Sequence, residues 1–238
     1  MEESSRLRPH DWAFFVELGA GVLALTALFR GHAWWALAWA ILAVGAGVTA
    51  RRWSLSRRGP MPHSISWTLH LPRGPHSPRN LQRILQPRPG ERMLEIGPGI
   101  GIHSLPIAAA LRPDGTLDVL DVQQAMLDDV ARRAAAAGVS NITPRRGDAR
   151  TLPYADHTFD AAYLVTVLGE IPDERAVLRE LRRVLKPDGR LVIGEFFLDP
   201  DFIRLPVLKQ QAADAGLVFE GRTGSAAVYF AAFRPAAA

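Results

Sequence analysis

Residues 93–101 read MLEIGPGIG, a short hydrophobic run that enters three glycines at alternate positions. Residues 102–111 follow with a helical pattern, so this stretch predicts a strand, a tight loop and a helix. Glycine permits a sharp turn and leaves no Cβ between the backbone and a ligand. In an open parallel sheet, ligands bind at the carboxyl ends of the strands. The stretch therefore predicts an α/β fold with a ligand site at residues 97–101.

The flanking sequence alternates short β-rich runs with longer helical stretches. Strands are predicted at residues 92–96, 116–120, 142–146, 159–165, 190–195, 217–222 and 226–233. Helices are predicted at residues 79–85, 102–111, 123–137, 174–185 and 204–215. This alternation is typical of βαβ units, whereas the short link at residues 223–225 permits only an antiparallel pair. We expect a Rossmann-like sheet of seven strands, mostly parallel, with an antiparallel last strand.

Two further strand ends carry carboxylates. Asp121 ends the predicted second strand, 20 residues after Gly101, where it can accept hydrogen bonds from both hydroxyls of a ribose. Asp148 and Ala149 follow the third strand, and a carboxylate beside a small residue suits the amino group of an adenine. Each alone could be a solvated strand end or a plain turn. Together with the glycines they predict a nucleoside site, and Ile102 departs from the dinucleotide fingerprint.

These segments resemble the class I S-adenosylmethionine-dependent methyltransferases, and within them the ubiquinone and menaquinone methyltransferases. The resemblance covers about residues 77–233 and rests on four ordered motifs: LEIGPGIG, LDVLDVQQAML, GDARTLPYADHTFDAAYLVTVL and LRELRRVLKPDGRLVIGEF. It implies S-adenosyl-L-methionine as the cofactor and no metal. It also implies cofactor-binding roles for Glu95, Gly97, Pro98, Gly99 and Gly101 at the methionine moiety, Asp121 at the ribose, Val122, Asp148 and Ala149 at the adenine, and Val165 and Thr166 at the amino-acid end.

The sequence leaves the catalytic groups open. Related sequences often carry a histidine after the fourth strand, where this chain has Gly169 and Glu170. Methyl transfer needs a general base only if the nucleophile must lose a proton. The candidates at the predicted crevice are Glu170, His157 and Glu195, with His103 behind the glycines.

The substrate pocket is expected to lie among residues 61–75, 169–173 and 196–205. These segments carry apolar side chains that include Trp67, Phe196 and Phe202. An apolar wall predicts a hydrophobic or lipid-linked small molecule as the substrate.

The first 52 residues differ from the rest of the chain. Residues 12–29 contain one charge, Glu17, and residues 33–50 contain none. At 1.5 Å per residue, 18 residues span about 27 Å, close to the hydrocarbon thickness of a bilayer. These stretches predict a transmembrane helical hairpin, with a signal peptide or a buried or interface-lying αα-hairpin as alternatives. The flanking arginines predict a membrane protein whose catalytic domain is cytoplasmic.

Residues 53–76 are predicted to be a basic, proline-rich connector to a methyltransferase domain at residues 77–234. Residues 1–90 hold 11 Arg, no Lys and 4 acidic residues, while residues 91–238 carry 17 basic and 20 acidic residues. The basic charge next to the hairpin predicts contact with anionic lipid, and no nucleic acid is expected as a partner.

Three alternatives to a membrane-anchored methyltransferase remain open at this stage. They are an NAD(P)-dependent oxidoreductase, a nucleic-acid methyltransferase recruited through the arginines, and a binding module that has lost catalysis.

Overall fold

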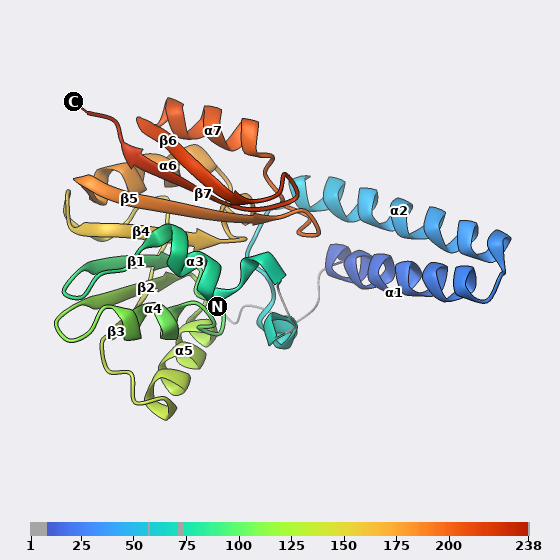
Figure 1. The fold of residues 1–238 in the computed structure, drawn as a ribbon, viewed down its shortest axis with the longest axis horizontal. Helices are drawn as coiled ribbons and strands as arrows, with labels where there is room; N and C mark the ends of the chain where they lie inside the picture. The colour runs from blue at the N-terminus through green and yellow to red at the C-terminus, as the bar shows by residue number, and fades with distance from the viewer. Residues whose placement is uncertain (1–8, 57, 71–73, 238) are drawn as a thin grey trace.

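The computed structural model describes residues 9–56, 58–70 and 74–237. Its body is a seven-stranded sheet in the order β3-β2-β1-β4-β5-β7-β6 (Figure 1). The strands are β1 Arg92–Ile96, β2 Thr116–Asp121, β3 Ile142–Arg146, β4 Phe159–Val165, β5 Leu185–Phe196, β6 Leu217–Gly224 and β7 Val228–Pro235. β7 runs antiparallel to β5 and β6, and the remaining neighbours pair in parallel. The predicted mixed sheet is therefore confirmed.

Helices cover both faces of this sheet. They are α3 Pro78–Leu85, α4 Ser104–Ala110, α5 Gln124–Ala136, α6 Glu174–Val184 and α7 Leu205–Asp214. Successive strand residues point to opposite faces, so Met93 packs in the core beside α3, α4 and α5, while Leu94 packs in the core beside α6 and α7. Both faces of β1 are therefore buried from Met93 to Ile96, where Glu95 alone is not hydrophobic.

Two predicted boundaries shift for local reasons. β5 begins at Leu185 rather than at residue 190, because Leu185 already pairs with Phe159 and the turn at residues 186–189 bulges out before Arg190 pairs with Ala161. α4 begins at Ser104 rather than at residue 102, because the turn that follows the glycines continues to residue 103. Both shifts leave the strand order and the strand ends unchanged.

The first two helices form the predicted hairpin. α1 covers Pro9–Phe29 and α2 covers Ala33–Ser56, and they lie side by side and project from the body (Figure 1). Their contact uses small residues, because the Glu17 carboxylate packs over Gly47, where an added Cβ would lie 2.6 Å from Oε1. Large apolar side chains such as Leu28 and Trp34 remain exposed.

The prediction that this hairpin spans a membrane is wrong. Across the residues that the structure describes, no helix combines the length and the apolar character that a bilayer crossing requires. α1 also carries Glu17 within its apolar run, and an acidic side chain inside a bilayer is costly. The same finding contradicts the predicted membrane location, and the orientation inferred from the flanking arginines no longer applies.

The arginines after the hairpin bind the body of the protein. Arg51 donates to the carbonyl oxygens of Pro200 at 3.4 Å and Phe202 at 2.9 Å. Arg58 forms a 2.6 Å ion pair with Glu174 at the start of α6. Two charges that predicted lipid contact therefore have protein partners. Arg51 holds the end of α2 against the loop between β5 and α7, and Arg58 holds the segment after α2 against the start of α6.

Candidate active site

The glycine loop leaves β1 at the centre of the sheet. Gly97, Gly99 and Gly101 have φ values of 65°, 54° and 82°, a region that L side chains rarely adopt. A Cβ at Gly97 would lie 2.5 Å from Val167 Cγ2, and one at Gly99 would lie 2.7 Å from Leu69 Cδ1. The loop is therefore restricted to glycine both by backbone conformation and by space, as expected of a backbone cradle for a ligand.

Asp121 lies beside this loop, at the carboxyl end of β2. The two strands are neighbours, and the Gly97 N–H donates to the carbonyl oxygen of Leu120 at 2.9 Å. Asp121 is partly exposed, and its Oδ1 accepts the Gln123 N–H at 2.8 Å. Val122 is 38% exposed and follows it directly. A carboxylate and an apolar side chain thus stand together one strand away from the glycines.

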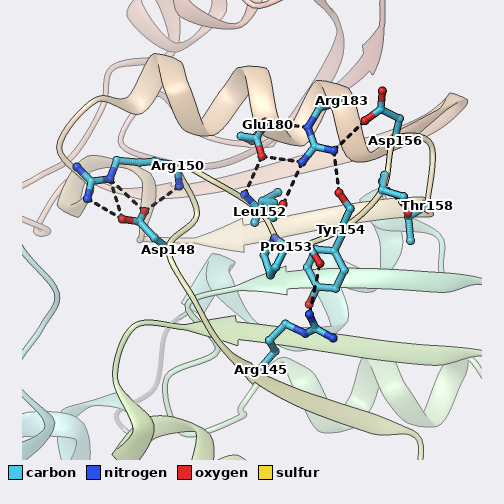
Figure 2. Close-up of polar contacts among 11 residues, drawn as sticks. Arg145, Asp148, Arg150, Leu152, Pro153, Tyr154, Asp156, Thr158, Glu180 and Arg183 are labelled. Carbon is cyan, nitrogen blue, oxygen red and sulfur yellow. Dashed lines mark hydrogen bonds and ion pairs between the residues drawn. The ribbon is translucent and has the colours of Figure 1, made fainter.

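Asp148 and Ala149 lie after β3, the next strand along the sheet. Ala149 is buried, while Asp148 is engaged by Arg150, which donates from its backbone at 2.9 Å and from Nη2 at 2.6 Å (Figure 2). The Arg150 hydrogen bonds lower the pKa of Asp148. Asp148 therefore stays an anionic acceptor, and a ligand amine would share it with Arg150.

The segment after Asp148 is held by α6. Arg183 donates to the carbonyl oxygens of Leu152 at 3.0 Å and Tyr154 at 2.7 Å, and it pairs with Glu180 at 2.7 Å and Asp156 at 2.8 Å (Figure 2). Three of these four contacts reach residues 152–156 and reduce the freedom of this loop. This network fixes where the third strand end presents its carboxylate.

The fourth strand ends in a strained residue. Thr166 has a φ of 55°, and its N–H donates to the carbonyl oxygen of Gly194 at 2.8 Å. Positive φ at a β-branched residue costs energy and is found most often at functional sites. Val165, which precedes it, is 9% exposed. Val165 and Thr166 therefore lie at the carboxyl end of β4, next to the glycine loop at the carboxyl end of β1.

Glu95 lies beneath the loop rather than in the crevice. Its side chain is 3% exposed, and Oε2 has no hydrogen-bond partner among the described residues. Burial raises its pKa to about 7, although the neighbouring hydroxyls of Ser104 and Tyr163 act in the opposite direction. Glu95 is thus placed to support the loop from below.

The three catalytic candidates lie in three different environments. His157 precedes β4 and so lies at the amino-terminal end of that strand, away from the glycines at the carboxyl end of β1. Its Nδ1 lies 3.0 Å from the carbonyl oxygen of Leu185. Glu195 is 2% exposed beneath the loop that follows β5, and its Oε2 accepts the Ile203 N–H at 3.0 Å. Burial raises its pKa well above the usual range.

Glu170 is the candidate that reaches the crevice. It ends a 3₁₀ turn, Leu168–Glu170, directly after β4 and is partly buried. Its Oε2 accepts the Met61 N–H at 3.3 Å. Burial raises its pKa well above the usual range, and the nearby carboxylates of Asp199, Asp201 and Asp121 add to the effect.

The sequence did not predict that residues 61–69 pack over the carboxyl ends of these strands. The carbonyl oxygen of Met61 accepts a hydrogen bond from Gln123 Nε2 at 2.9 Å, and Leu69 covers Gly99. Residues 61–75 were assigned to the substrate pocket by position alone. No local signal marks Gln123 or Leu69, because both contacts depend on residues far away in the chain.

Comparisons with known proteins agree with this geometry. Residues 93–189 match the family model of a methyltransferase domain. A demethylmenaquinone methyltransferase of Bacillus cytotoxicus is 32% identical over 117 residues, which cover 49% of each chain. The 27-O-demethylrifamycin SV methyltransferase of Amycolatopsis mediterranei is 31% identical over 137 residues, 57% of this chain and 50% of the relative. This chain thus spans about half the length of the curated relatives it matches.

The body also resembles solved structures. A SAM-dependent methyltransferase from Aquifex aeolicus superposes with a TM-score of 0.67 at 18% identity, covering 74% of this chain and 98% of that one. At this identity the likeness concerns the fold alone.

Proposed function

We propose that this chain, whose body is a class I S-adenosylmethionine-dependent methyltransferase domain, methylates a hydrophobic or lipid-linked small molecule. The observation that carries the proposal is the row of neighbouring strand ends formed by β3, β2, β1 and β4. It supplies a glycine cradle at residues 97–101 and carboxylates at Asp121 and Asp148, all at the carboxyl ends of these parallel strands. An NAD(P) site is less well supported, because the glycine spacing differs from the dinucleotide fingerprint.

The residues at this edge fit S-adenosylmethionine, the cofactor of the domain. Gly97, Gly99 and Gly101 have positive φ values, which turn the backbone sharply at the end of β1, so the methionine moiety would bind along the backbone of this loop. The positions that a Cβ on Gly97 or Gly99 would take are already filled by Val167 and Leu69. The partly exposed Asp121 would accept from the ribose hydroxyls, and Val122 and Ala149 would contact the adenine. Asp148 would accept from the exocyclic amine alongside Arg150.

When bound, the cofactor supplies an electrophilic methyl group on a sulfonium. The task of the protein is to hold the acceptor in line with that group and to exclude water. Val165 and Thr166 would position the donor from the fourth strand. Of the three candidate bases, Glu170 alone combines a place in the crevice with partial exposure, and its raised pKa makes its carboxylate a stronger base than an ordinary one.

The walls around the crevice support an apolar substrate. Phe197 is 51% exposed in the loop after β5, and Trp67 is 57% exposed in the segment that covers the glycines. Phe202 is partly buried, with its ring 6.1 Å from that of Tyr229. The exposed apolar hairpin adjoins the same loop through Arg51. Relatives named for demethylmenaquinone and for 27-O-demethylrifamycin SV are consistent with a small-molecule acceptor.

The test is single-turnover methylation by the full chain. Purified protein would be mixed with methyl-labelled S-adenosylmethionine and, in separate reactions, with an organic-solvent extract, an aqueous metabolite extract and RNA. We expect label in the organic fraction and none with Asp121→Ala, which lacks the ribose acceptor. Label confined to water-soluble products would refute the substrate class, and label in RNA would favour the nucleic-acid alternative. Tight NAD(P) binding without S-adenosylmethionine binding would refute the activity.

A further inference from the structure

Residues 59–70, which we call the strap, cross the carboxyl ends of the central strands. Met61 alone bridges the segments that follow β4 and β2. Its N–H donates to Glu170 Oε2 at 3.3 Å, just after β4, and its carbonyl oxygen accepts from Gln123 Nε2 at 2.9 Å, just after β2. β1 lies between β2 and β4 in the sheet. The strap therefore passes over the end of β1, where the glycine loop begins.

The rest of the strap follows the loop outward. Its 3₁₀ helix, His63–His70, places Leu69 against the loop, so that a Cβ on Gly99 would lie 2.7 Å from Leu69 Cδ1. His63 Nε2 lies 2.9 Å from Asp129 Oδ2 on α5, which fixes the other side. A shallow cleft continues beyond this contact, lined by Ser66, Trp67, Ile100, Asp129, Arg132 and Arg133.

We propose that the strap is the roof of the cofactor site and that Gln123 and Glu170 are positioning residues that set the affinity and residence time of the cofactor. The inference rests on the proposed function, because the ligand beneath the roof is the methyl donor. The glycine loop, Asp121 and Asp148 form the floor and one wall of the site. The Met61 peptide, held from both sides, closes that space toward solvent.

This role differs from general-base catalysis in what it asks of Glu170. A positioning role needs only an oxygen that accepts the Met61 N–H, which the amide oxygen of a glutamine also provides. A base must accept a proton from the substrate, which a glutamine does not do. Glu170→Gln therefore separates the two roles, because it keeps the acceptor and removes the carboxylate.

The first test uses adjacent glutamines. Gln123→Ala removes the side chain that holds the Met61 carbonyl oxygen but keeps the backbone N–H that Asp121 accepts. Gln124→Ala is the matched control, since Gln124 Nε2 donates to Asp128 within α5 and is exposed. Calorimetry would give the Kd for S-adenosylmethionine and for its demethylated product. For Gln123→Ala we expect Kd to rise about fivefold, the value of one hydrogen bond, with the control unchanged.

The second test uses Glu170. We expect Glu170→Ala to raise both Kd and the KM for S-adenosylmethionine about tenfold and Glu170→Gln to restore them to within about threefold. Hydrogen exchange of the peptide that covers residues 59–70 is expected to slow when the demethylated product binds. The unfolding midpoint in urea would show that each variant is folded.

The possible outcomes separate this inference from the proposed function. If the wild type binds neither form of the cofactor, both are overturned. If the wild type binds but Gln123→Ala matches Gln124→Ala and strap exchange is unaltered, only the roof is refuted. If Glu170→Gln loses kcat as fully as Glu170→Ala while Kd stays constant, Glu170 is a base and its positioning role is refuted.

Discussion

Glu95→Gln is expected to change how the stability of the protein depends on pH. The wild-type carboxyl is 3% exposed beneath the glycine loop, and burial raises its pKa to about 7 from an ordinary value of 4.5. The folded protein therefore binds this proton more tightly than the unfolded chain does. Between the two pKa values, the unfolded chain releases this proton while the folded protein keeps it. The free energy of unfolding of the wild type therefore falls as the pH rises through this interval.

The size of the effect follows from the two pKa values. A difference of about 2.5 pKa units at about 1.4 kcal/mol per unit is about 3.5 kcal/mol, and about 2.5 kcal/mol of it develops between pH 5 and pH 8. A glutamine is neutral throughout and fills nearly the same volume. The free energy of unfolding of Glu95→Gln relative to wild type should thus rise by about 2.5 kcal/mol across that range.

Urea unfolding of the cofactor-free protein at several pH values would measure this difference. Other buried carboxylates, such as Glu195, titrate in both proteins and cancel. Glu180→Gln is the control, because Arg183 lowers the pKa of Glu180 and moves its titration below 4.5. Its difference from wild type should stay constant between pH 5 and pH 8. If the free energy of unfolding varied with pH in the same way for wild type and Glu95→Gln, the argument that burial raises the pKa of Glu95 would be refuted.

Two further predictions concern the loop and the hairpin. Gly97→Ala forces a side chain into a φ of 65° and to within 2.5 Å of Val167, so we expect loss of cofactor binding by calorimetry and about 1–3 kcal/mol lower stability in urea. Arg58→Ala leaves the Glu174 side chain, 9% exposed, without its cation, and should lower stability by about 1–2 kcal/mol. Arg175→Ala, which breaks an exposed 3.5 Å pair, should change stability by less than about 0.5 kcal/mol; equal effects of the two arginine variants would contradict the docking of the connector.

The fold could be predicted from the sequence where local pattern and tertiary environment agree. β1 and β4 are buried on both faces, so their hydrophobic runs end where the strands end. The short link at residues 223–225 restricted the last pair to an antiparallel arrangement, as observed. β5 was shortened in the prediction because the turn at residues 186–189 resembles a loop, although the strand continues on its far side.

The error at the hairpin has a physical origin. Absence of charge and suitable length were both correctly identified in residues 33–50, and a helix does form there. Length and lack of charge therefore predicted the helix but did not establish that it crosses a bilayer, and among the described residues no helix suits that crossing. The arginines after it were assigned to lipid by their sign alone. Arg51 instead binds carbonyl oxygens of the body, and a charge count does not distinguish these partners.

The candidate site shows the same division between what is local and what is not. Its floor is contiguous in sequence, because a strand, its glycines and the following helix position one another, and the pattern therefore predicted it. Its roof joins Met61 to Gln123 across 62 residues and to Glu170 across 109. The donor at one end of that chain of contacts is a backbone N–H, which every residue except proline carries, so side-chain identity at position 61 holds no signal for it. Substitutions at Gln123 and Glu170, rather than at the residue they hold, are therefore the ones that test how the site closes.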